Sequence, residues 1–319
     1  MASSRKQVCY SVIMAGGIGT RFWPRSRMDR PKQLLNITGD EVLLKKAVEL
    51  IKPITPPERI KIVTTRSQAE AVRRIVPDIA QQDIIVEPFG RNTAPAIGIS
   101  ALYVEQNHPE SVMVVLPADH YIEDHNIFQR TIRVAVDKAL HKDCIVTIGI
   151  SPRVPETGYG YIEAGELINK EHAIYTVNSF HEKPDLQRAR DFMERGNFFW
   201  NSGMFISRAS VMLREIGEHL PRIYELIMEI RVALGTDEEQ KVLEEAYGKM
   251  EAISIDYGVI EKSRNVLMVE GNFGWDDVGC WSSAAYYWPH DGKENACMGE
   301  VLNLDSSRCI VHSPKKLVA

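Results

Sequence analysis

Residues 12–33 read Val-Ile-Met-Ala-Gly-Gly-Ile-Gly-Thr-Arg-Phe-Trp-Pro-Arg-Ser-Arg-Met-Asp-Arg-Pro-Lys-Gln. The apolar run 8–14 predicts a buried strand, and it ends in a turn with little side chain, Gly16-Gly17-Ile18-Gly19-Thr20. A cluster of basic side chains follows within a dozen residues: Arg21, Arg25, Arg27, Arg30 and Lys32. Glycines let backbone N–H groups approach an oxyanion closely, and N–H groups combined with cations hold phosphates. The order therefore predicts a polyphosphate site after the first strand.

Two familiar phosphate-binding loops do not fit this stretch. A Walker loop needs Gly-Lys-Ser/Thr after its spacer, and that tripeptide occurs nowhere in the chain. A dinucleotide fingerprint needs a third glycine where this chain has Phe22. Pro24 also disfavours helical geometry at Trp23, so a helix cannot open there.

The composition is that of an ordinary soluble globular protein. The 319 residues are 44% hydrophobic and 25% charged, which favours one large α/β domain with an appendage over two equal domains. A net charge of −5 gives no global attraction for nucleic acid, so anions must be bound by local clusters.

Cysteine and histidine usage predicts a cytoplasmic protein without a zinc site. The five cysteines have no Cys-x-x-Cys spacing, and the nine histidines form no His-Glu-x-x-His motif. Arg5-Lys6 before the first apolar run could suggest a signal peptide, but the run is short and ends in the glycine turn. No run has the length of a membrane span, so we expect no membrane partner.

Strand-like and helix-like stretches alternate through the first half of the chain. Short runs rich in Val and Ile predict strands at 8–14, 60–65, 84–87, 112–116 and 144–150. Helical spacing predicts helices at 43–51, 68–75, 94–105 and 128–140, and later at 209–230 and 238–249. This alternation is typical of a Rossmann-like, mostly parallel mixed sheet flanked by helices, in which ligands bind beyond the carboxyl ends of the strands.

The glycine loop and the residues that follow it resemble a known signature. Gly17-Ile18-Gly19-Thr20-Arg21, Pro24 and then Pro31-Lys32 are similar to Gly-x-Gly-Thr-Arg-x-x-Pro…Pro-Lys of the sugar-1-phosphate nucleotidylyltransferases. The resemblance implies the α/β fold of nucleotide-diphospho-sugar transferases. It also implies that Ala15, Gly16, Gly17, Gly19 and Thr20 bind the nucleotide, and that Arg21 and Lys32 are catalytic.

A second motif begins at Glu87 and reads Glu-Pro-Phe-Gly-Arg-Asn-Thr-Ala-Pro-Ala. Thr93 as an N-cap and Pro95 just inside a helix explain part of it. The run resembles Glu-Pro-x-x-Arg-Asn-Thr-Ala-Pro of the mannose-1-phosphate guanylyltransferases, which implies that Glu87, Arg91, Asn92 and Thr93 face the guanine of GTP. Guanine has an O6 acceptor and N1–H and N2–H donors, so its pocket needs both a donor and an acceptor.

Aspartates follow two further apolar runs. Leu116-Pro117-Ala118-Asp119 and Trp275-Asp276-Asp277-Val278-Gly279 resemble the two metal-binding motifs of the family. They imply that Asp119 and Asp277 bind Mg²⁺, an ion that carboxylates hold well. Because two aspartates are adjacent, Asp276 remains the alternative to Asp277.

Three short motifs resemble the sugar side of the family's cleft. The run 157–163 implies Gly158 and Glu163 as sugar-binding residues, and Glu182-Lys183-Pro184 implies that Lys183 meets the phosphate of the sugar 1-phosphate. Asn201-Ser202-Gly203 resembles a sugar contact, so Asn201 and Ser202 join the sugar-binding set.

Together the motifs imply transfer of GMP from GTP to mannose 1-phosphate, giving GDP-mannose and pyrophosphate by direct in-line attack with Mg²⁺. The alternatives are a catalytically silent GDP-sugar-binding regulatory subunit and a sibling nucleotidylyltransferase with another NTP or sugar phosphate. The assembly is left open, a homodimer included. We expect a catalytic domain at 1–290 and, at 291–319, the start of a small β-helical tail that is shortened at Ala319.

Overall fold

The computed structural model describes residues 8–17 and 19–319, so Arg5, Lys6 and Ile18 lie outside the described residues. A nine-stranded sheet in the order β3-β2-β1-β4-β9-β6-β10-β8-β7 forms its centre. The strands of this sheet are β1 (Cys9–Met14), β2 (Ile60–Thr65), β3 (Ile84–Glu87), β4 (Val112–Pro117), β6 (Ile145–Ile150), β7 (Tyr161–Asn169), β8 (Ile174–His181), β9 (Phe198–Arg208) and β10 (Val266–Glu270). A small second sheet pairs β5 (Tyr121–Ile122) with β11 (Trp275–Asp276).

The large sheet is mixed but mostly parallel. Strands β3, β2, β1 and β4 run side by side in parallel, and β10 is parallel to β6. Strand β9 is antiparallel to β4, β6 and β7, and β8 is antiparallel to β10 and β7. Relative to β1, therefore, only β8 and β9 run in the opposite direction within this sheet. The predicted fold class is confirmed.

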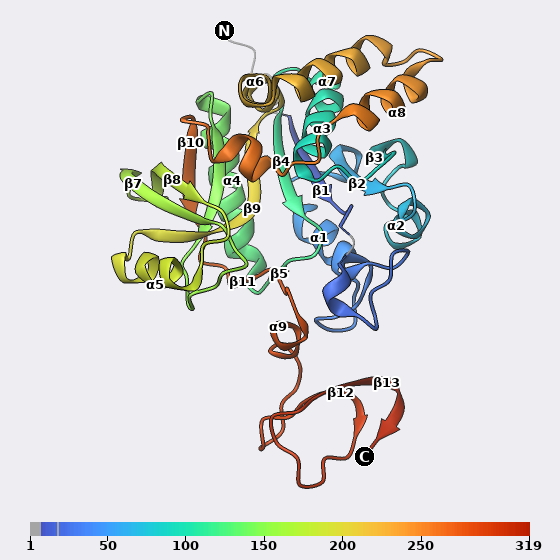
Figure 1. Ribbon diagram of the computed structural model, residues 1–319, viewed down its shortest axis with the longest axis vertical. Coiled ribbons are helices and arrows are strands. Elements are labelled where there is room, and N and C mark those ends of the chain that lie inside the picture. Colours follow the sequence, from blue (N-terminus) through green and yellow to red (C-terminus); the bar gives the residue numbers. More distant parts are fainter. Residues whose placement is uncertain (1–7, 18) are drawn as a thin grey trace.

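Helices cover both faces of the sheet (Figure 1). The helices are α1 (Leu43–Ile51), α2 (Ala69–Ile75), α3 (Thr93–Asn107), α4 (His125–His141), α5 (Leu186–Arg195), α6 (Ala209–His219), α7 (Pro221–Ala233), α8 (Glu239–Lys249) and α9 (Trp281–Ala285). One buried core joins the sheet to α1, α2, α4 and α5, and a second joins it to α3, α6, α7 and α8. Strand β4 alternates between them, with Val114 in the first core and Met113 and Val115 in the second, as side chains on a strand must.

Most predicted elements lie where they were expected, and one prediction was wrong. The single helix expected at 209–230 is two helices, because α6 ends at His219 and α7 begins at Pro221. Proline lacks the N–H that a continuing helix needs and pushes the preceding residue out of helical geometry. Leu220 accordingly has φ −135° and ψ 58°.

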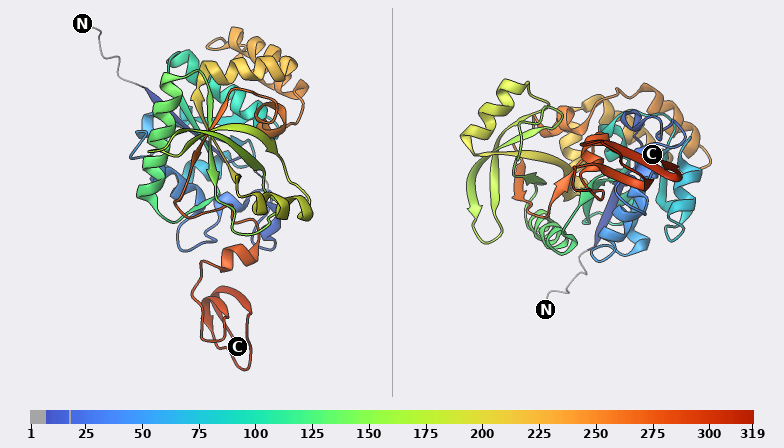
Figure 2. Two further views of the ribbon diagram at one scale, coloured as in Figure 1. Left: turned by 90° about the vertical axis from the view of Figure 1, so that its left-hand side faces the viewer. Right: turned by 90° about the horizontal axis from the view of Figure 1, so that it is seen from below.

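The C-terminal segment extends away from the sheet (Figure 2). It follows α9 and contains β12 (Ala296–Val301) and β13 (Ile310–Val318), which pair in parallel. A third buried cluster joins this tail to the segment after the glycine loop: Phe22, Leu35, Ile37, Val278, Ala284, Ala285, Trp288 and Ala296. The predicted domain boundary at residue 290 falls between α9 and β12 and remains a prediction.

Within the described part of the chain, no helix is both long enough and apolar enough to cross a membrane.

Candidate active site

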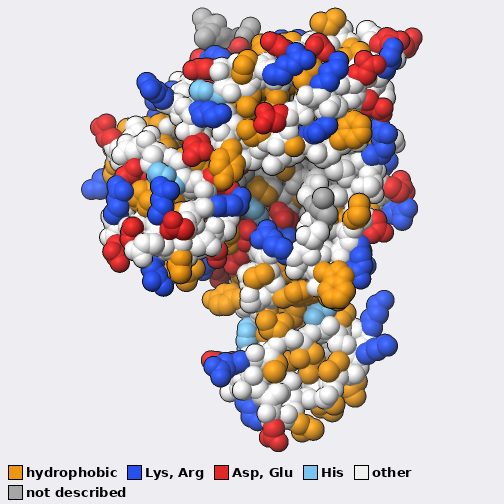
Figure 3. Space-filling view, viewed as in Figure 1, with side chains coloured by type: hydrophobic (Ala, Val, Ile, Leu, Met, Phe, Trp, Pro, Cys, Tyr) orange, Lys and Arg blue, Asp and Glu red, His pale blue; other side chains and the backbone are white. Residues whose placement is uncertain are grey.

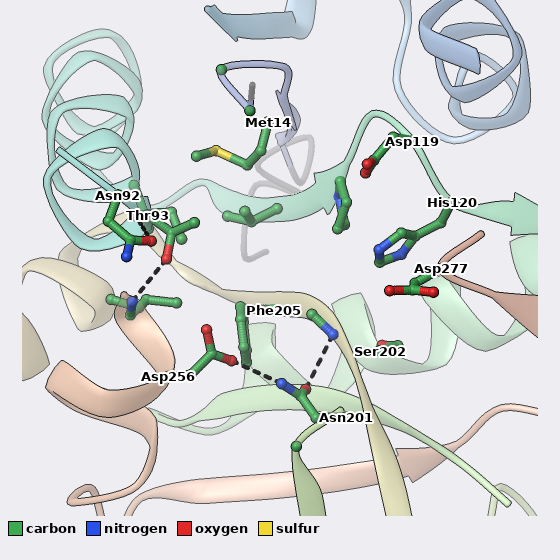
Figure 4. A pocket seen from close by; sticks show the side chains of 18 of the residues that line it. Met14, Asn92, Thr93, Asp119, His120, Asn201, Ser202, Phe205, Asp256 and Asp277 are labelled. Carbon is green, nitrogen blue, oxygen red and sulfur yellow. Dashed lines mark hydrogen bonds between the residues drawn. The ribbon is translucent and has the colours of Figure 1, made fainter. Parts of the chain in front are cut away.

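A cavity of about 390 Å³ lies beyond the carboxyl ends of the parallel strands. The face seen in Figure 3 is hollowed near its middle, where acidic and basic side chains lie close together. The following residues that the sequence predicted for the site line the cavity: Gly16, Gly17, Glu87, Arg91, Asn92, Thr93, Asp119, Gly158, Asn201, Ser202 and Asp277. Figure 4 shows Asn92 and Thr93 across the cavity from Asp119 and Asp277.

The glycine loop is shaped by close contacts as well as by its lack of side chains. A Cβ on Gly16 would lie 2.8 Å from Oε2 of Glu87. Gly19 has φ +57°, and a Cβ there would lie 2.7 Å from the backbone nitrogen of Lys32. Both positions therefore need glycine, one for the approach of a carboxylate and one for a left-handed turn packed on the lysine.

Gln33, which belongs to the first motif but was not predicted to have a role, fixes this loop. Its Nε2 lies 2.9 Å from the carbonyl oxygens of Ala15 and Gly17 and 3.0 Å from Oε1 of Gln68. The Gln33 side chain is 3% exposed. A buried amide that binds two carbonyl groups of one turn holds that turn in a single conformation.

Charged groups from three distant parts of the chain meet beside one end of the cavity, where Asp119 and Asp277 line it but Arg21 and Lys32 do not. The Lys32 ammonium lies 2.8 Å from Oδ2 of Asp119 and also donates to the backbone oxygen of Asp277. The position that a Cβ on Gly279 would occupy is 3.2 Å from Nη1 of Arg21 and 3.0 Å from Oδ1 of Asp277, so these two side chains both lie beside Gly279. The structure thus brings the predicted Arg21, Lys32, Asp119 and Asp277 together.

The two adjacent aspartates have different surroundings. Asp276 accepts hydrogen bonds from the backbone of Val278 at 2.6 Å and from the Tyr287 hydroxyl at 3.1 Å, and it does not line the cavity. Asp277 lines the cavity and accepts a hydrogen bond from the Tyr159 hydroxyl at 2.8 Å. Asp276 therefore shapes the turn, while Asp277 faces the space where a ligand would bind.

Electrostatics at this end favour an ionised carboxylate. Burial alone would raise the pKa of Asp119, but Lys32, with contributions from His120 and Arg21, outweighs it, and the pKa lies below its usual value. Burial lowers the pKa of His120, although Asp119 acts to raise it, and Nδ1 of His120 accepts a hydrogen bond from Nε1 of Trp275 at 3.1 Å.

The predicted base-binding segment is held by hydrogen bonds at the start of α3. Asn92 has φ +66°, and its side chain accepts a hydrogen bond from the Thr93 backbone at 2.9 Å. The Thr93 hydroxyl accepts from the backbone of Ile255 at 2.8 Å, and Arg91 donates to the carbonyl of Gly248 at 2.7 Å. The bonds to Ile255 and Gly248 fasten the segment to the last turn of α8 and to the chain that follows it.

Glu87 is a buried carboxylate at the base-binding side. It is 5% exposed, and its Oε1 accepts a hydrogen bond from the Tyr247 hydroxyl at 2.8 Å. Burial raises the pKa of Glu87 to about 7, although the bond from Tyr247 acts to lower it. An acceptor with this pKa changes its charge near neutral pH.

The predicted sugar side contains a second polar cluster. Asn201 donates to Oδ1 of Asp256 at 2.8 Å, and Glu182 and Asp256 both line the cavity. Burial, with a contribution from Glu182, raises the pKa of Asp256 to about 6. Lys183 does not line the cavity, but its ammonium lies 2.5 Å from Oε1 of Glu182. Burial alone would lower the pKa of Lys183, but Glu182 outweighs it, and the pKa lies above its usual value.

Four predicted nucleotide or sugar residues are not among those that line the cavity: Ala15, Gly19, Thr20 and Glu163. The Ala15 N–H donates to the carbonyl of Val63 at 2.7 Å, so it is not free to bind a phosphate. The Glu163 carboxylate accepts from Ser179 at 2.7 Å and pairs with Arg195, which occupies the oxygens expected to bind sugar hydroxyls. We therefore leave Ala15 and Glu163 out of the site.

Sequence reasoning also missed several residues that line the cavity: Gln33, Tyr159, Glu182, Gly203 and Asp256. Gln33 and Glu182 stand directly beside Lys32 and Lys183 in two of the motifs that predicted the site. This adjacency is the signal from which both residues could have been predicted. Asp256 comes from an irregular helical turn at 256–260 and reaches the cavity only through the tertiary fold. No local pattern marks it.

Comparison with known proteins identifies the family. Residues 10–290 match the family described as Nucleotidyl transferase. The chain is 38% identical over 315 residues to the alginate biosynthesis protein AlgA of Pseudomonas aeruginosa, covering 97% of this chain and 64% of AlgA. It is 37% identical to the mannose-1-phosphate guanylyltransferase of Escherichia coli K12, covering 97% of this chain and 66% of that protein.

A solved structure of similar fold is titled mannose-1-phosphate geranyltransferase, from Thermus thermophilus. It has a TM-score of 0.83 and 34% identity, covering 97% of this chain and 88% of that one. The chain belongs to the nucleotidyl transferase family, and the resemblance to mannose-1-phosphate guanylyltransferases is confirmed. The chain spans 64% of the length of the AlgA relative.

Proposed function

We propose that this protein transfers GMP from GTP to mannose 1-phosphate, releasing pyrophosphate and forming GDP-mannose. One observation carries the proposal. A glycine loop and two carboxylates line one end of a cavity, two cations lie beside those carboxylates, and the other walls hold a base-side segment and a cluster of polar groups. The chain's relatives include proteins named mannose-1-phosphate guanylyltransferase, which supports the choice of substrates.

The residues can perform this reaction by positioning and charge neutralisation. A sugar phosphate has a second pKa of about 6, so at neutral pH it is already largely a dianion that can attack the α-phosphorus in line. Arg21 and Lys32 lie where they would neutralise the phosphates of GTP, and Lys183 lies beside the hydroxyl-binding cluster, where it would meet the sugar phosphate. No side-chain nucleophile is needed, because the substrate supplies its own.

The donor set suits Mg²⁺. Asp119 and Asp277 offer carboxylate oxygens to the same end of the cavity, and Mg²⁺ is usually held by one or two carboxylates together with phosphate oxygens and waters. When bound, the ion would neutralise charge that develops on the phosphates. Lys32, which contacts Asp119 in the structure, would then share that carboxylate with the ion.

Base selection would depend on Glu87 and the segment 91–93. The buried Glu87 carboxylate is an acceptor for the N1–H and N2–H of guanine, whereas adenine has no donor at N1 or C2. A pocket built to accept hydrogen bonds rejects a base that cannot donate them, because the Glu87 oxygen that Tyr247 does not hold would be left without a donor.

The decisive experiment measures pyrophosphate release with each of four NTPs crossed with mannose, glucose and fucose 1-phosphates. We expect GTP with mannose 1-phosphate to give the highest kcat/KM. A preference for ATP or dTTP would contradict the guanylyl assignment and favour a sibling nucleotidylyltransferase. Folded protein that binds GDP-mannose but releases no pyrophosphate with any pair would favour the regulatory alternative.

A further inference from the structure

We propose that Tyr247, at the end of α8, is a positioning residue for base selection: its hydroxyl holds the Glu87 carboxylate in the orientation that reads the 2-amino group of guanine. This inference rests on the proposed function and goes beyond it, because it assigns purine selectivity to a helix outside the strand-end loops.

The contact joins two buried groups from distant parts of the chain. The Tyr247 hydroxyl donates to Oε1 of Glu87 at 2.8 Å, and the two side chains are 1% and 5% exposed. Among the residues that the structure describes, Tyr247 is the only hydrogen-bond donor to this carboxylate. A glutamate side chain has three rotatable bonds. The hydrogen bond from Tyr247 restricts them and keeps Oε1 on the side of α8.

The second oxygen of Glu87 is directed to the glycine loop. Oε2 lies 2.8 Å from the point where a Cβ on Gly16 would be, and both residues line the cavity. Tyr247 therefore fixes Oε1, and Oε2, for which no hydrogen-bond donor is found among the described residues, is the oxygen left to accept from a ligand in the cavity. One oxygen held in this way can accept from the 2-amino group of guanine.

The surroundings of Glu87 make this bond important for its charge. Burial raises the pKa of Glu87 to about 7, and the Tyr247 bond is the feature that opposes it. The charged or titratable groups that act on Tyr247 are Glu87 and Tyr103, and Tyr103 donates to Glu239 at 3.1 Å. Burial raises the pKa of Tyr247 well above its usual value, so Tyr247 stays a donor throughout the neutral range.

The chain supplies a matched control. Tyr103 lies on α3, and its hydroxyl also donates to a glutamate, but that glutamate is Glu239 on α8 and not Glu87. Tyr103→Phe therefore removes the same atom from a second tyrosine–glutamate hydrogen bond that does not include the carboxylate at the cavity.

The experiment compares GTP with inosine triphosphate, which keeps N1–H and O6 but lacks the 2-amino group, at saturating mannose 1-phosphate. We expect Tyr247→Phe to lower the preference for GTP over inosine triphosphate, measured as the ratio of kcat/KM values, by about tenfold, as for a lost hydrogen bond to a charged group. We expect Tyr103→Phe to keep the wild-type ratio. An unchanged ratio in Tyr247→Phe, or an equal loss in both variants, would overturn the inference.

The pH profile gives a second readout. Removing the Tyr247 bond takes away the feature that lowers the Glu87 pKa, so that pKa rises. As the pH is lowered, KM for GTP should therefore start to increase earlier, at a higher pH, in Tyr247→Phe than in the wild type or in Tyr103→Phe. A profile that coincides with that of the wild type would contradict the proposed role.

A double-mutant cycle separates positioning from folding. If Tyr247 acts through Glu87, Tyr247→Phe should change selectivity little in a Glu87→Gln background, whereas fully additive effects would overturn the inference. Failure of the proposed function has a different signature, because the wild type itself would then show no preference for GTP.

Discussion

At the level of single residues, the surroundings of a carboxylate decide its role. Asp276 and Asp277 are neighbours in the chain, yet one completes a turn and the other faces the cavity. Glu87 and Glu163 both belong to motifs that resemble binding sites, yet Glu163 is neutralised by Arg195 while Glu87 faces the cavity without a basic partner among the described residues.

The adjacent aspartates provide a direct test of the metal assignment. Asp277→Asn should lower kcat/KM by more than about 100-fold, since even residues that only support metal ligands cost about 10- to 100-fold when changed. The melting temperature should stay close to that of the wild type, because an asparagine oxygen can still accept the Tyr159 hydrogen bond. Pyrophosphate release in the presence of graded Mg²⁺, and after EDTA treatment, provides the measurement.

Asp276→Asn is the matched control for that change. It should retain catalysis and lower thermal stability instead, because the two oxygens of Asp276 accept separately from Val278 and Tyr287, and an asparagine can replace only one of these two acceptors. Loss of activity in Asp276→Asn with normal activity in Asp277→Asn would reverse the assignment. Full activity in EDTA would remove the metal from the mechanism.

Among the elements, the glycine loop and the segment that carries Lys32 act as one unit. Gln33 binds the carbonyls of Ala15 and Gly17, and Gln68 at the start of α2 supports it. The direction of the loop's N–H groups is therefore set by the Gln33 amide nitrogen, which binds carbonyl oxygens on both sides of Gly16.

Replacing Gln33 should consequently impair catalysis without removing any catalytic group. We expect Gln33→Ala to lower kcat/KM for GTP by about 10- to 100-fold, the range found when a reacting group is displaced or a supporting contact is lost. Steady-state kinetics with varied GTP would measure the change. An effect on mannose 1-phosphate alone would show that the loop does not hold the triphosphate.

The elements that sequence predicted best are those with strong local patterns. Apolar runs bounded by turn residues placed β2 and β3 at their observed ends, and the motif at 87–96 marked the start of α3. Asp256 and Tyr247 could not be found in this way, because only the tertiary fold brings them to the site. Asp256 lines the cavity, and Tyr247 contacts Glu87, which lines it. The break at Leu220 was missed because the apolar spacing continues past Pro221 even though the backbone hydrogen bonds do not.

In the molecule as a whole, the tail is connected to the catalytic end of the sheet. Phe22 follows Arg21 and packs on α9, from which the tail continues: its ring centroid is 5.2 Å from that of Trp281, and Trp288 donates to the carbonyl of Ile37 at 2.7 Å. Arg25 lies 2.8 Å from Nε2 of His312 on β13. The cluster thus packs against both ends of the segment that carries Arg21 and Lys32.

Disrupting this cluster should loosen the basic segment. Trp288 is 4% exposed, and Trp288→Ala should cost about 3–5 kcal/mol, the range for truncating a buried aromatic side chain. Because Trp288 packs on Trp281, which in turn packs on Phe22, the basic segment should loosen and activity should fall at temperatures below the main unfolding transition. Tyr286→Ala, at a side chain that is 69% exposed, is the control and should match the wild type in both activity and melting.

The order of strands in the sheet has a consequence for how the chain is made. Strand β4 is complete at Pro117, but its partner β9 begins only at Phe198. A ribosome therefore releases a half-sheet whose central edge, with its row of unpaired N–H and C=O groups, stays open while the next segments are synthesised. Exposed strand edges recruit other chains, so this interval is when the nascent protein is most prone to aggregate and most dependent on chaperones.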